Sequence, residues 1–304
     1  MAERKSSPVT HVEVDGRRLR LSNLEKVLYP ATGFTKGQVV DYYARIGPTM
    51  LPHLARRPVT MVRLPDGIEG ERFFEKRCPG HRPDWLPTVP LDADSAIQAC
   101  CIEEVPSLVW TANLAALELH TPQATADEPW KPTAMVFDLD PGAPADVVDC
   151  ARVARELADL LEQLGLHSVV KTSGSKGLHL SVPLRPVVDA ETTKSFALAL
   201  GQLLEQRDPK RVTVTMAKEQ RPNKVFVDWS QNDRHKTTVC AYSLRATPTP
   251  GVSTPLSWDE VDEIADGDAE LAQHTPTEVV DRVHELGDLY ADSLAVDQEL
   301  PALG

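Results

Sequence analysis

The sequence predicts an α+β fold in which a mixed β-sheet is flanked by helices. Short runs rich in β-branched residues alternate with amphipathic stretches of helical spacing, most regularly over residues 131–250. Hydrophobic residues make up 41% of the chain and charged residues 25%, which is the balance of a globular protein and not of a disordered one. A length of 304 residues suits one large domain or two intimately packed ones.

The first half of the chain begins with a predicted hairpin. Residues 11–22 alternate in polarity on both sides of Asp15-Gly16, a dipeptide typical of tight hairpin turns. Thr35 has the position of an N-cap for a helix that we expect to reach about residue 52. The other predicted elements of this half are loops with short strands over 57–90, a buried helix over 107–119 and a polar connector over 121–133.

The second half alternates strands and helices more regularly. Apolar positions recur every second residue in the strands and every third or fourth residue in the helices. The predicted strands are 134–140, 168–172, 178–182, 212–216 and 225–229, and the predicted helices are 145–165, 190–206, 257–265 and 276–288.

Charge is distributed unevenly along the chain. The net charge is −13, but residues 251–304 hold 14 acidic residues and one basic residue and therefore carry all of it. Residues 1–77 have a net charge of +5 and residues 171–245 a net charge of +6. Because a polyanion responds to charge within a Debye length of about 8 Å, these basic regions keep a nucleic-acid partner possible.

Three aspartates are candidates for a metal site. Asp138 and Asp140 lie two residues apart in the strand AMVFDLD, so both carboxylates point to the same face near the end of that strand. Asp228 follows three apolar residues in another strand and needs a partner, because an isolated buried charge is very costly. A divalent cation that prefers oxygen ligands would relieve the repulsion among them. A surface carboxylate, a turn cap or a satisfied structural carboxylate is the alternative.

A glycine-containing turn, TSGSKGLH, occupies residues 172–179. Gly174 and Gly177 allow backbone N–H groups to approach an anion, and Ser173, Lys176 and His179 add donors and positive charge. The spacing differs from that of the P-loop, and a strand follows instead of a helix. A plain Ser/Gly hairpin is the alternative interpretation of this turn. Together with the three aspartates, the turn indicates phosphoryl or nucleotidyl transfer with two metal ions.

Several motifs, in order, resemble the polymerase domain of bacterial DNA ligase D, a member of the archaeo-eukaryotic primase superfamily. They are LSNLEKVLYPATGFTK, RFFEK, LELHTPQ, VFDLDPG, TSGSKGLHL, VFVDWSQN, KTT and YSLR, between about residue 20 and about residue 290. The resemblance implies a primase-like catalytic core and an enzyme that adds nucleotides, preferably ribonucleotides, to primer 3′ ends at gaps or double-strand breaks. In the VTMVRL strand, Met61 and Val62 occupy a stretch where the family often has a basic residue.

The resemblance also implies a role for each matching residue. Asp138, Asp140 and Asp228 would be catalytic and would hold two divalent cations, Mn²⁺ being favoured over Mg²⁺. The nucleotide-binding residues would be His120, at the end of the predicted helix, for the sugar, and Ser173, Lys176, His179 and Arg245 for the triphosphate. The DNA-binding residues would be Asn23, Lys26 and Lys36 at a 5′-phosphate, Phe73 and Phe74 on the template, and Gln231 and Lys236 in the loop after the third aspartate.

Residues 1–304 are predicted to form a single primase-polymerase domain. Residues 1–130 would carry the DNA 5′-phosphate and template contacts, 131–250 the catalytic sheet and 251–304 an acidic segment. The expected partners are DNA with gaps or ends that bear a 5′-phosphate, NTP or dNTP, Ku and a DNA ligase. No ligase or nuclease motif is seen, and the initial Met and the acidic tail favour a free-standing polymerase over an excised domain.

The expected location is the bacterial cytoplasm, in association with the nucleoid and not with a membrane. No apolar run approaches the length of a membrane span, and the N-terminus, MAERKSSPVT, is polar. An odd, scattered set of five cysteines suits a reducing compartment better than a disulfide framework. A zinc site built from Cys78 and His81 with Cys100 or Cys101 is a weaker hypothesis than ordinary buried or surface cysteines.

Three other functions are compatible with parts of the pattern. The motif FDLD also occurs in phosphotransferases of the haloacid dehalogenase class, but there it usually lies near the N-terminus and is followed by Gly-Thr. D-x-D glycosyltransferases bind Mn²⁺ but leave the glycine turn and Asp228 without a role. A non-catalytic module that tethers DNA ends is the third alternative, against which the retention of all three aspartates and Lys176 argues.

Overall fold

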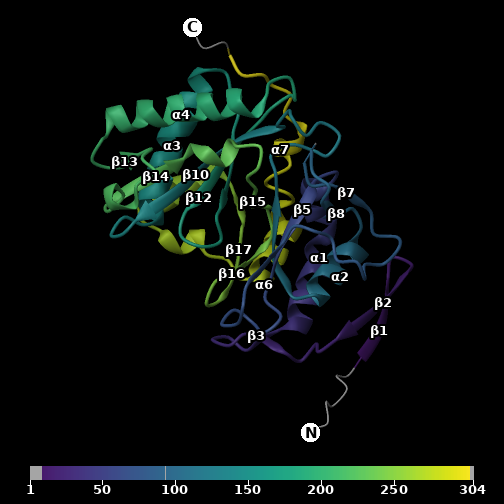
Figure 1. Cartoon of the computed structure of the whole chain (residues 1–304). Helices are drawn as coiled ribbons and strands as arrows, with labels where there is room; N and C mark the ends of the chain where they lie inside the picture. The colour runs from purple at the N-terminus through teal and green to yellow at the C-terminus, as the bar shows by residue number, and fades with distance from the viewer. Residues whose placement is uncertain (1–8, 93, 302–304) are drawn as a thin grey trace.

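The computed structural model describes residues 9–92 and 94–301, and its framework is two six-stranded sheets with helices packed on them (Figure 1). The polar N-terminal segment before residue 9 lies outside the described residues. The mixed sheet with flanking helices that the sequence predicts is present, so the predicted fold class is confirmed. Within the described ranges, no helix is long and apolar enough to cross a membrane.

The sheet that carries the three aspartates, called here the aspartate sheet, has the strand order β13-β14-β10-β12-β11-β18. All its neighbours pair antiparallel except β13 and β14, which are parallel. Its strands are β10 (Ala134–Gly142), β11 (Val169–Thr172), β12 (Leu178–Pro183), β13 (Val212–Thr213), β14 (Lys224–Asp228) and β18 (Pro255–Leu256).

Alternation along these strands separates a packed face from a polar one. Phe137 and Leu139 of β10, like Leu178 of β12 and Val227 of β14, are buried in one hydrophobic cluster with the helices on that face. Those helices are α3 (Val147–Gln163), α4 (Ala190–Arg207) and α5 (Trp258–Asp266). Since successive side chains of a strand point to opposite faces, Asp138 must point away from α3 and α4.

A second sheet, called here the N-terminal sheet, has the order β15-β9-β5-β8-β7, with β6 also paired to β5. Its strands are β5 (Pro58–Arg63), β6 (Phe73–Glu75), β7 (Thr88–Pro90), β8 (Gln98–Cys101), β9 (Ala116–Thr121) and β15 (Thr238–Val239). Helices α1 (Lys36–Leu54), α2 (Val105–Asn113) and α6 (Pro276–Leu286) share its hydrophobic cluster. Thr35 caps α1 through a capping box, as the sequence predicts.

Short ladders complete the fold. The predicted hairpin is formed by β1 (Val9–Val14) and β2 (Arg17–Ser22), and Asp15 and Gly16 both have positive φ, as a two-residue turn of this type requires. The other ladders are β3 (Val27–Tyr29) with β4 (Phe34–Thr35), and β16 (Leu244–Ala246) with β17 (Pro250–Val252). The remaining helical segments are η1 (Lys218–Gln220), η2 (Trp229–Asn232), η3 (Ala269–Ala272) and α7 (Asp292–Ala295).

The acidic C-terminal segment packs against both halves of the molecule (Figure 1). Val261 and Ile264 of α5 are buried in the cluster of the aspartate sheet, whereas Val279 and Val280 of α6 are buried in that of the N-terminal sheet. Amphipathic spacing therefore lets an acidic segment cover apolar surface while its charged side chains face solvent.

Two elements differ from the sequence-based expectation. The predicted helix 107–119 ends at Asn113, Ala115 has a φ of 56°, and the rest of the segment is strand β9. Pairing with β5 and β15 therefore outweighs helical propensity, and His120 lies in a strand and not at a helix end. The predicted strand 212–216 is reduced to Val212–Thr213 at the edge of its sheet.

The cysteines also differ from the expectation of free thiols. Cys78 and Cys100 form a disulfide, which joins strand β8 to the segment after β6. The backbone N–H of Cys78 donates to Gln98 O at 2.7 Å and so holds the two cysteines side by side. The disulfide consumes two of the ligands that the zinc hypothesis needs, and His81 lies against Trp110 instead. Cys101, Cys150 and Cys240 are buried thiols.

Candidate active site

Four polar side chains form a row across the polar face of the aspartate sheet. In the strand register, Lys171 is opposite His179, His179 is opposite Asp138, and Asp138 is opposite Asp228. Directly opposed residues in antiparallel strands have neighbouring side chains. The register therefore brings a cation, an imidazole and two carboxylates together from four different strands.

The two opposed carboxylates share one donor. The amide Nε2 of Gln231 donates to Asp138 Oδ2 at 3.3 Å and to Asp228 Oδ2 at 3.1 Å. Asp228 Oδ1 also accepts from the backbone N–H of Ser230 at 2.9 Å and from its hydroxyl. Lys236 donates to the same hydroxyl, so Gln231 and Lys236 both belong to the surroundings of Asp228.

Asp140 lies at the open edge of this group. Burial beside the sheet, followed by repulsion from Asp138 and Asp228, raises the pKa of Asp140 to about 7. Burial also opposes ionisation of Asp138, but its pKa is lowered, because His179 and then Lys171 and Arg245 favour the carboxylate. The three carboxylates are thus near enough to repel one another, and the neighbouring positive charges bring the pKa of Asp138, but not that of Asp140, below its ordinary value.

This donor set fits a divalent cation in chemistry. Among the described residues, Asp138 Oδ1 is buried and has no well-formed hydrogen bond, and carboxylate oxygens are the ligands that Mg²⁺ and Mn²⁺ prefer. Within the described ranges, however, no three His, Cys, Asp or Glu side chains already stand together as a group able to hold a metal ion.

His179 is held from both sides. Its Nδ1 lies 3.1 Å from Lys171 Nζ, and its Nε2 lies 3.2 Å from Asp138 Oδ1. Burial and the charge of Lys171 lower the pKa of His179. Lys171 also donates to Ser253 Oγ at 2.7 Å, and burial lowers its own pKa to about 7. A neutral imidazole that accepts a hydrogen bond at Nδ1 carries its own proton on Nε2, toward Asp138.

A cavity of about 290 Å³ opens in front of this row. It collects all five predicted nucleotide-binding residues together with two of the aspartates and Gln231, whereas Asp228, which is 8% exposed, does not line it. The lining residues are His120, Asp138, Asp140, Ser173, Ser175, Lys176, His179, Gln231, Thr237, Thr238, Val239 and Arg245. The sequence-predicted nucleotide set is therefore contiguous in space.

The glycine turn forms one wall of this cavity, and both glycines are required by close approach. A Cβ on Gly177 would lie 1.9 Å from Leu139 O, and Gly174 has a φ of +67°. The hydroxyl of Ser173 accepts from Ser175 N at 3.2 Å and from Gly177 N at 3.1 Å. The turn is thus held by Ser173, whereas Lys176 is exposed toward the cavity.

The opposite wall is organised by a glutamate that sequence analysis did not single out. Glu118 Oε2 lies 2.8 Å from His120 Nε2, and Glu118 Oε1 lies 3.4 Å from Arg245 Nε. Burial opposes ionisation of Glu118, but the hydrogen bond from His120 and the charge of Arg245 bring its pKa to about 2. One ionised carboxylate therefore links two of the predicted nucleotide-binding residues.

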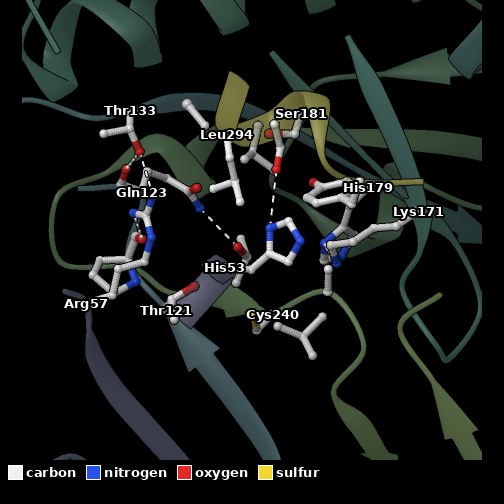
Figure 2. Close-up of a pocket in the computed structure, with 18 residues that line it drawn as sticks. His53, Arg57, Thr121, Gln123, Thr133, Lys171, His179, Ser181, Cys240 and Leu294 are labelled. Atoms are coloured by element: carbon white, nitrogen blue, oxygen red, sulfur yellow. Dashed lines mark hydrogen bonds between the residues drawn. The ribbon is translucent and has the colours of Figure 1, made fainter. Parts of the chain in front are cut away.

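A second, smaller cavity of about 60 Å³ lies behind His179 and Lys171 (Figure 2). Figure 2 shows these two side chains on one side and Arg57 with Thr133 on the other. Arg57 donates to Pro122 O at 3.1 Å and to Thr133 Oγ1 at 2.7 Å. A volume of this size holds only a few water molecules, so the larger cavity is the one that suits a substrate.

The three residues predicted to meet a 5′-phosphate lie around the start of α1. The backbone N–H of Lys26 donates to Asn23 O, and that of Lys36 to Lys26 O, at 3.0 and 2.8 Å. Lys36 is buried, and its ammonium donates to Ser22 O at 2.6 Å. Burial, followed by repulsion from Lys26 and Arg63, lowers the pKa of Lys36 to about 8. Arg63 joins this basic cluster, although the sequence had not marked it.

Phe73 and Phe74 lie on strand β6 at the edge of β5. Both side chains are exposed, at 44% and 65%, so neither fills the core. Large exposed aromatic residues next to basic side chains are a suitable surface for an unpaired base.

The residues that sequence analysis missed have weak local signals. Lys171 lies in an apolar strand, where a lysine is unusual. Glu118 lies in the segment 107–119, which the sequence predicts to be a helix. Asn232 follows Gln231 and holds β10 through two bonds, accepting from Val136 N and donating to Val136 O. Each of these three residues also has a partner far away in the sequence, namely Ser253, Arg245 and Val136 respectively.

Comparison with known proteins agrees with this arrangement. The family model described as LigD, primase-polymerase domain, matches residues 35–290. The multifunctional non-homologous end joining protein LigD of Mycolicibacterium smegmatis is 43% identical over 277 residues, which are 90% of this chain and 36% of that protein. The bifunctional LigD protein of Bacillus subtilis is 30% identical over 285 residues, which are 93% of this chain and 45% of that protein.

A solved structure is also similar. The polymerase domain of Mycobacterium tuberculosis ligase D, solved in complex with DNA, is 40% identical, with a TM-score of 0.84 over 93% of this chain and 99% of that one. This chain spans roughly a third to a half of the length of the LigD proteins named above. The resemblance predicted from the motifs is confirmed: the chain belongs to the family of LigD primase-polymerase domains, which are nucleotidyltransferases.

Proposed function

We propose that this chain is a template-directed nucleotidyltransferase that fills gaps and extends primer 3′ ends at DNA breaks, with a preference for ribonucleotides. The observation that carries the proposal is the cavity of about 290 Å³ that Asp138 and Asp140 line together with the five candidate nucleotide-binding residues. Family membership removes the haloacid dehalogenase and glycosyltransferase alternatives. The non-catalytic tether is left for experiment to exclude.

Asp138, Asp140 and Asp228 are the residues that would hold two divalent cations, for which we favour Mn²⁺. Such cations supply charge neutralisation for the triphosphate and acidification of the primer 3′-hydroxyl. The raised pKa of Asp140 and the buried Oδ1 of Asp138 support this assignment, because both indicate negative charge in need of a cation.

The incoming nucleotide would lie between the two walls of the cavity. On one wall, Lys176 and His179 would bind the triphosphate, with Ser173 keeping the turn in shape. On the other wall, Arg245 would bind phosphate and His120 the sugar. The strand ladder holds His179 and His120 on rigid elements, which reduces the entropic cost of orienting the substrate.

DNA would approach from the N-terminal sheet. Lys26 and Lys36 bracket a tight turn and lie close enough for their charges to interact, which supports a pocket for a 5′-phosphate. Phe73 and Phe74 would stack on the template. Gln231 and Lys236, beside Asp228, would help to position the DNA end and the nucleotide. The M. tuberculosis domain was solved in complex with DNA, which supports DNA binding by this chain.

The relatives named above act in non-homologous end joining, and we extend that pathway to this chain. Ku and a DNA ligase would then be its partners, the first presenting ends and the second sealing the filled gap. An association with the nucleoid would follow from DNA binding.

The decisive experiment is primer extension on a gapped duplex, comparing a 5′-phosphate with a 5′-hydroxyl gap, NTP with dNTP, and Mn²⁺ with Mg²⁺. Asp138→Asn is expected to abolish extension while gapped-DNA binding is retained. Asp41→Asn, at an exposed carboxylate of α1, is the matched control and should extend normally. A wild-type chain that binds gapped DNA but adds no nucleotide would support the tether alternative.

A further inference from the structure

Glu118 is a buried carboxylate on β9 whose partners all belong to the candidate nucleotide site. It is 3% exposed and lies two residues before His120, so both side chains project from the same face of the strand. A buried carboxylate is retained only when its partners satisfy it, so those partners indicate its purpose.

The two oxygens of Glu118 reach different parts of the site. Oε2 contacts His120 Nε2 at 2.8 Å, and Oε1 accepts from the backbone N–H of Ala246 at 3.0 Å. Oε1 is also 3.4 Å from Arg245 Nε. The carboxylate therefore couples the candidate sugar residue on β9 to the candidate triphosphate residue on β16.

The contact with His120 determines the chemistry of the ring. An ionised carboxylate only accepts, so the proton of the imidazole must be on Nε2. Within residues 9–92 and 94–301, no protein hydrogen bond reaches His120 Nδ1, and the ring lines the cavity. In the neutral ring, Nδ1 is then an acceptor, which matches the 2′-hydroxyl proton of a ribose, and a 2′-deoxyribose lacks that hydroxyl.

We propose that Glu118 is the positioning residue that sets the sugar preference: it fixes the tautomer and the orientation of His120 so that Nδ1 accepts a hydrogen bond from the 2′-hydroxyl of the incoming nucleotide. The inference rests on the proposed function and extends it from His120 to the residue that controls it. Discrimination arises because a deoxyribonucleotide leaves the prepared acceptor unpaired.

Glu118→Gln tests this with little change of shape. The glutamine carbonyl can still accept from Ala246 N, but its amide donates toward His120 Nε2 and so favours the opposite tautomer, with the proton on Nδ1. The ratio of kcat/KM for ATP to that for dATP, measured on a gapped duplex, should fall about tenfold, which is the usual scale for one lost hydrogen bond. The kcat/KM for dATP should change much less than the kcat/KM for ATP.

Two controls separate positioning from a general structural effect. In a His120→Ala background, Glu118→Gln should leave the ATP to dATP ratio unchanged, because the two side chains act as one unit. Glu260→Gln removes a comparable, largely buried carboxylate that pairs with Arg282 far from the cavity. It should lower the melting temperature without changing the ratio.

A spectroscopic measurement is independent of catalysis. The ¹⁵N shifts of the imidazole of His120 should report a proton on Nε2 in the wild-type chain and on Nδ1 in Glu118→Gln. A wild-type proton on Nδ1 would overturn the inference even if the variant failed to fold. An unchanged ratio in Glu118→Gln, or a fall that persists without His120, would also overturn it. Absence of any nucleotide addition by the wild-type chain would instead refute the proposed function.

Discussion

Replacing Lys171 by methionine should make the protein more stable and less active. The Lys171 side chain is 3% exposed and lies within a strand, in contact with His179 and Ser253. Methionine has nearly the same length and flexibility, so the change removes the charge and the two hydrogen bonds with little loss of packing. We expect the free energy of unfolding to rise at pH 7 and primer extension to fall, because His179 loses the group that orients it.

The magnitude follows from the pKa of the buried ammonium. Lowering the pKa of Lys171 from 10.5 to about 7 corresponds to about 5 kcal/mol against folding at pH 7 and below. Methionine removes this cost but sacrifices two hydrogen bonds of about 1 kcal/mol each and leaves a polar partner unmatched at a similar cost. The expected net gain is about 1–3 kcal/mol in the free energy of unfolding at pH 7.

The sign of the pH dependence gives a second check. Because the folded pKa lies below the unfolded one, unfolding takes up a proton between about pH 7 and 10.5, so the stability of the wild-type chain rises across this window. The advantage of Lys171→Met should therefore shrink by about 2–3 kcal/mol between pH 7 and pH 9.

Urea unfolding of the metal-free chain at both pH values measures this effect, with Lys210→Met, at an exposed lysine, as the matched control. A Lys171→Met variant that is less stable than the wild type at both pH values, by the same amount, would refute the reasoning. Full activity of that variant would show that His179 does not depend on Lys171.

Further predictions concern the DNA surface and the glycine turn. Phe73→Ala with Phe74→Ala should weaken gapped-DNA binding by about tenfold or more in fluorescence anisotropy, because stacking contributes about 1–3 kcal/mol per base; both side chains are exposed, so the melting temperature should hardly change. Lys26→Ala with Lys36→Ala should abolish the preference for 5′-phosphorylated over 5′-hydroxyl gaps while simple primer extension persists, and rising salt should erode the wild-type preference. Unaltered discrimination in that double variant would place the phosphate pocket elsewhere. Gly177→Ala should lower the melting temperature and nucleotide binding together, since the added Cβ would meet a carbonyl oxygen of β10 at 1.9 Å.

The sequence alone determined the features that depend on near neighbours. Asp15-Gly16 predicted the hairpin, and Thr35 predicted the start of α1, because turn and cap chemistry act over a few residues. Alternation in FDLD predicted that Asp138 and Asp140 share a face. The linear motifs also predicted the family, and five residues chosen from them line one cavity.

The tertiary structure decided everything that depends on strand pairing. Local sequence does not state which residue of β14 faces Asp138, yet the register makes it Asp228, and a slip of one residue would turn every side chain of the strand to the other face. Pairing with β5 and β15 makes residues 116–121 strand β9. Folding also places Glu118 beside Arg245, from which it is more than 100 residues away in the sequence. The charge on Lys171, the bridge through Gln231 and the disulfide at Cys78 likewise depend on partners that only folding brings near. Pairing energies are collective over two sheets, and burial sets the cost of each charge, so neither quantity can be read from a window of a few residues.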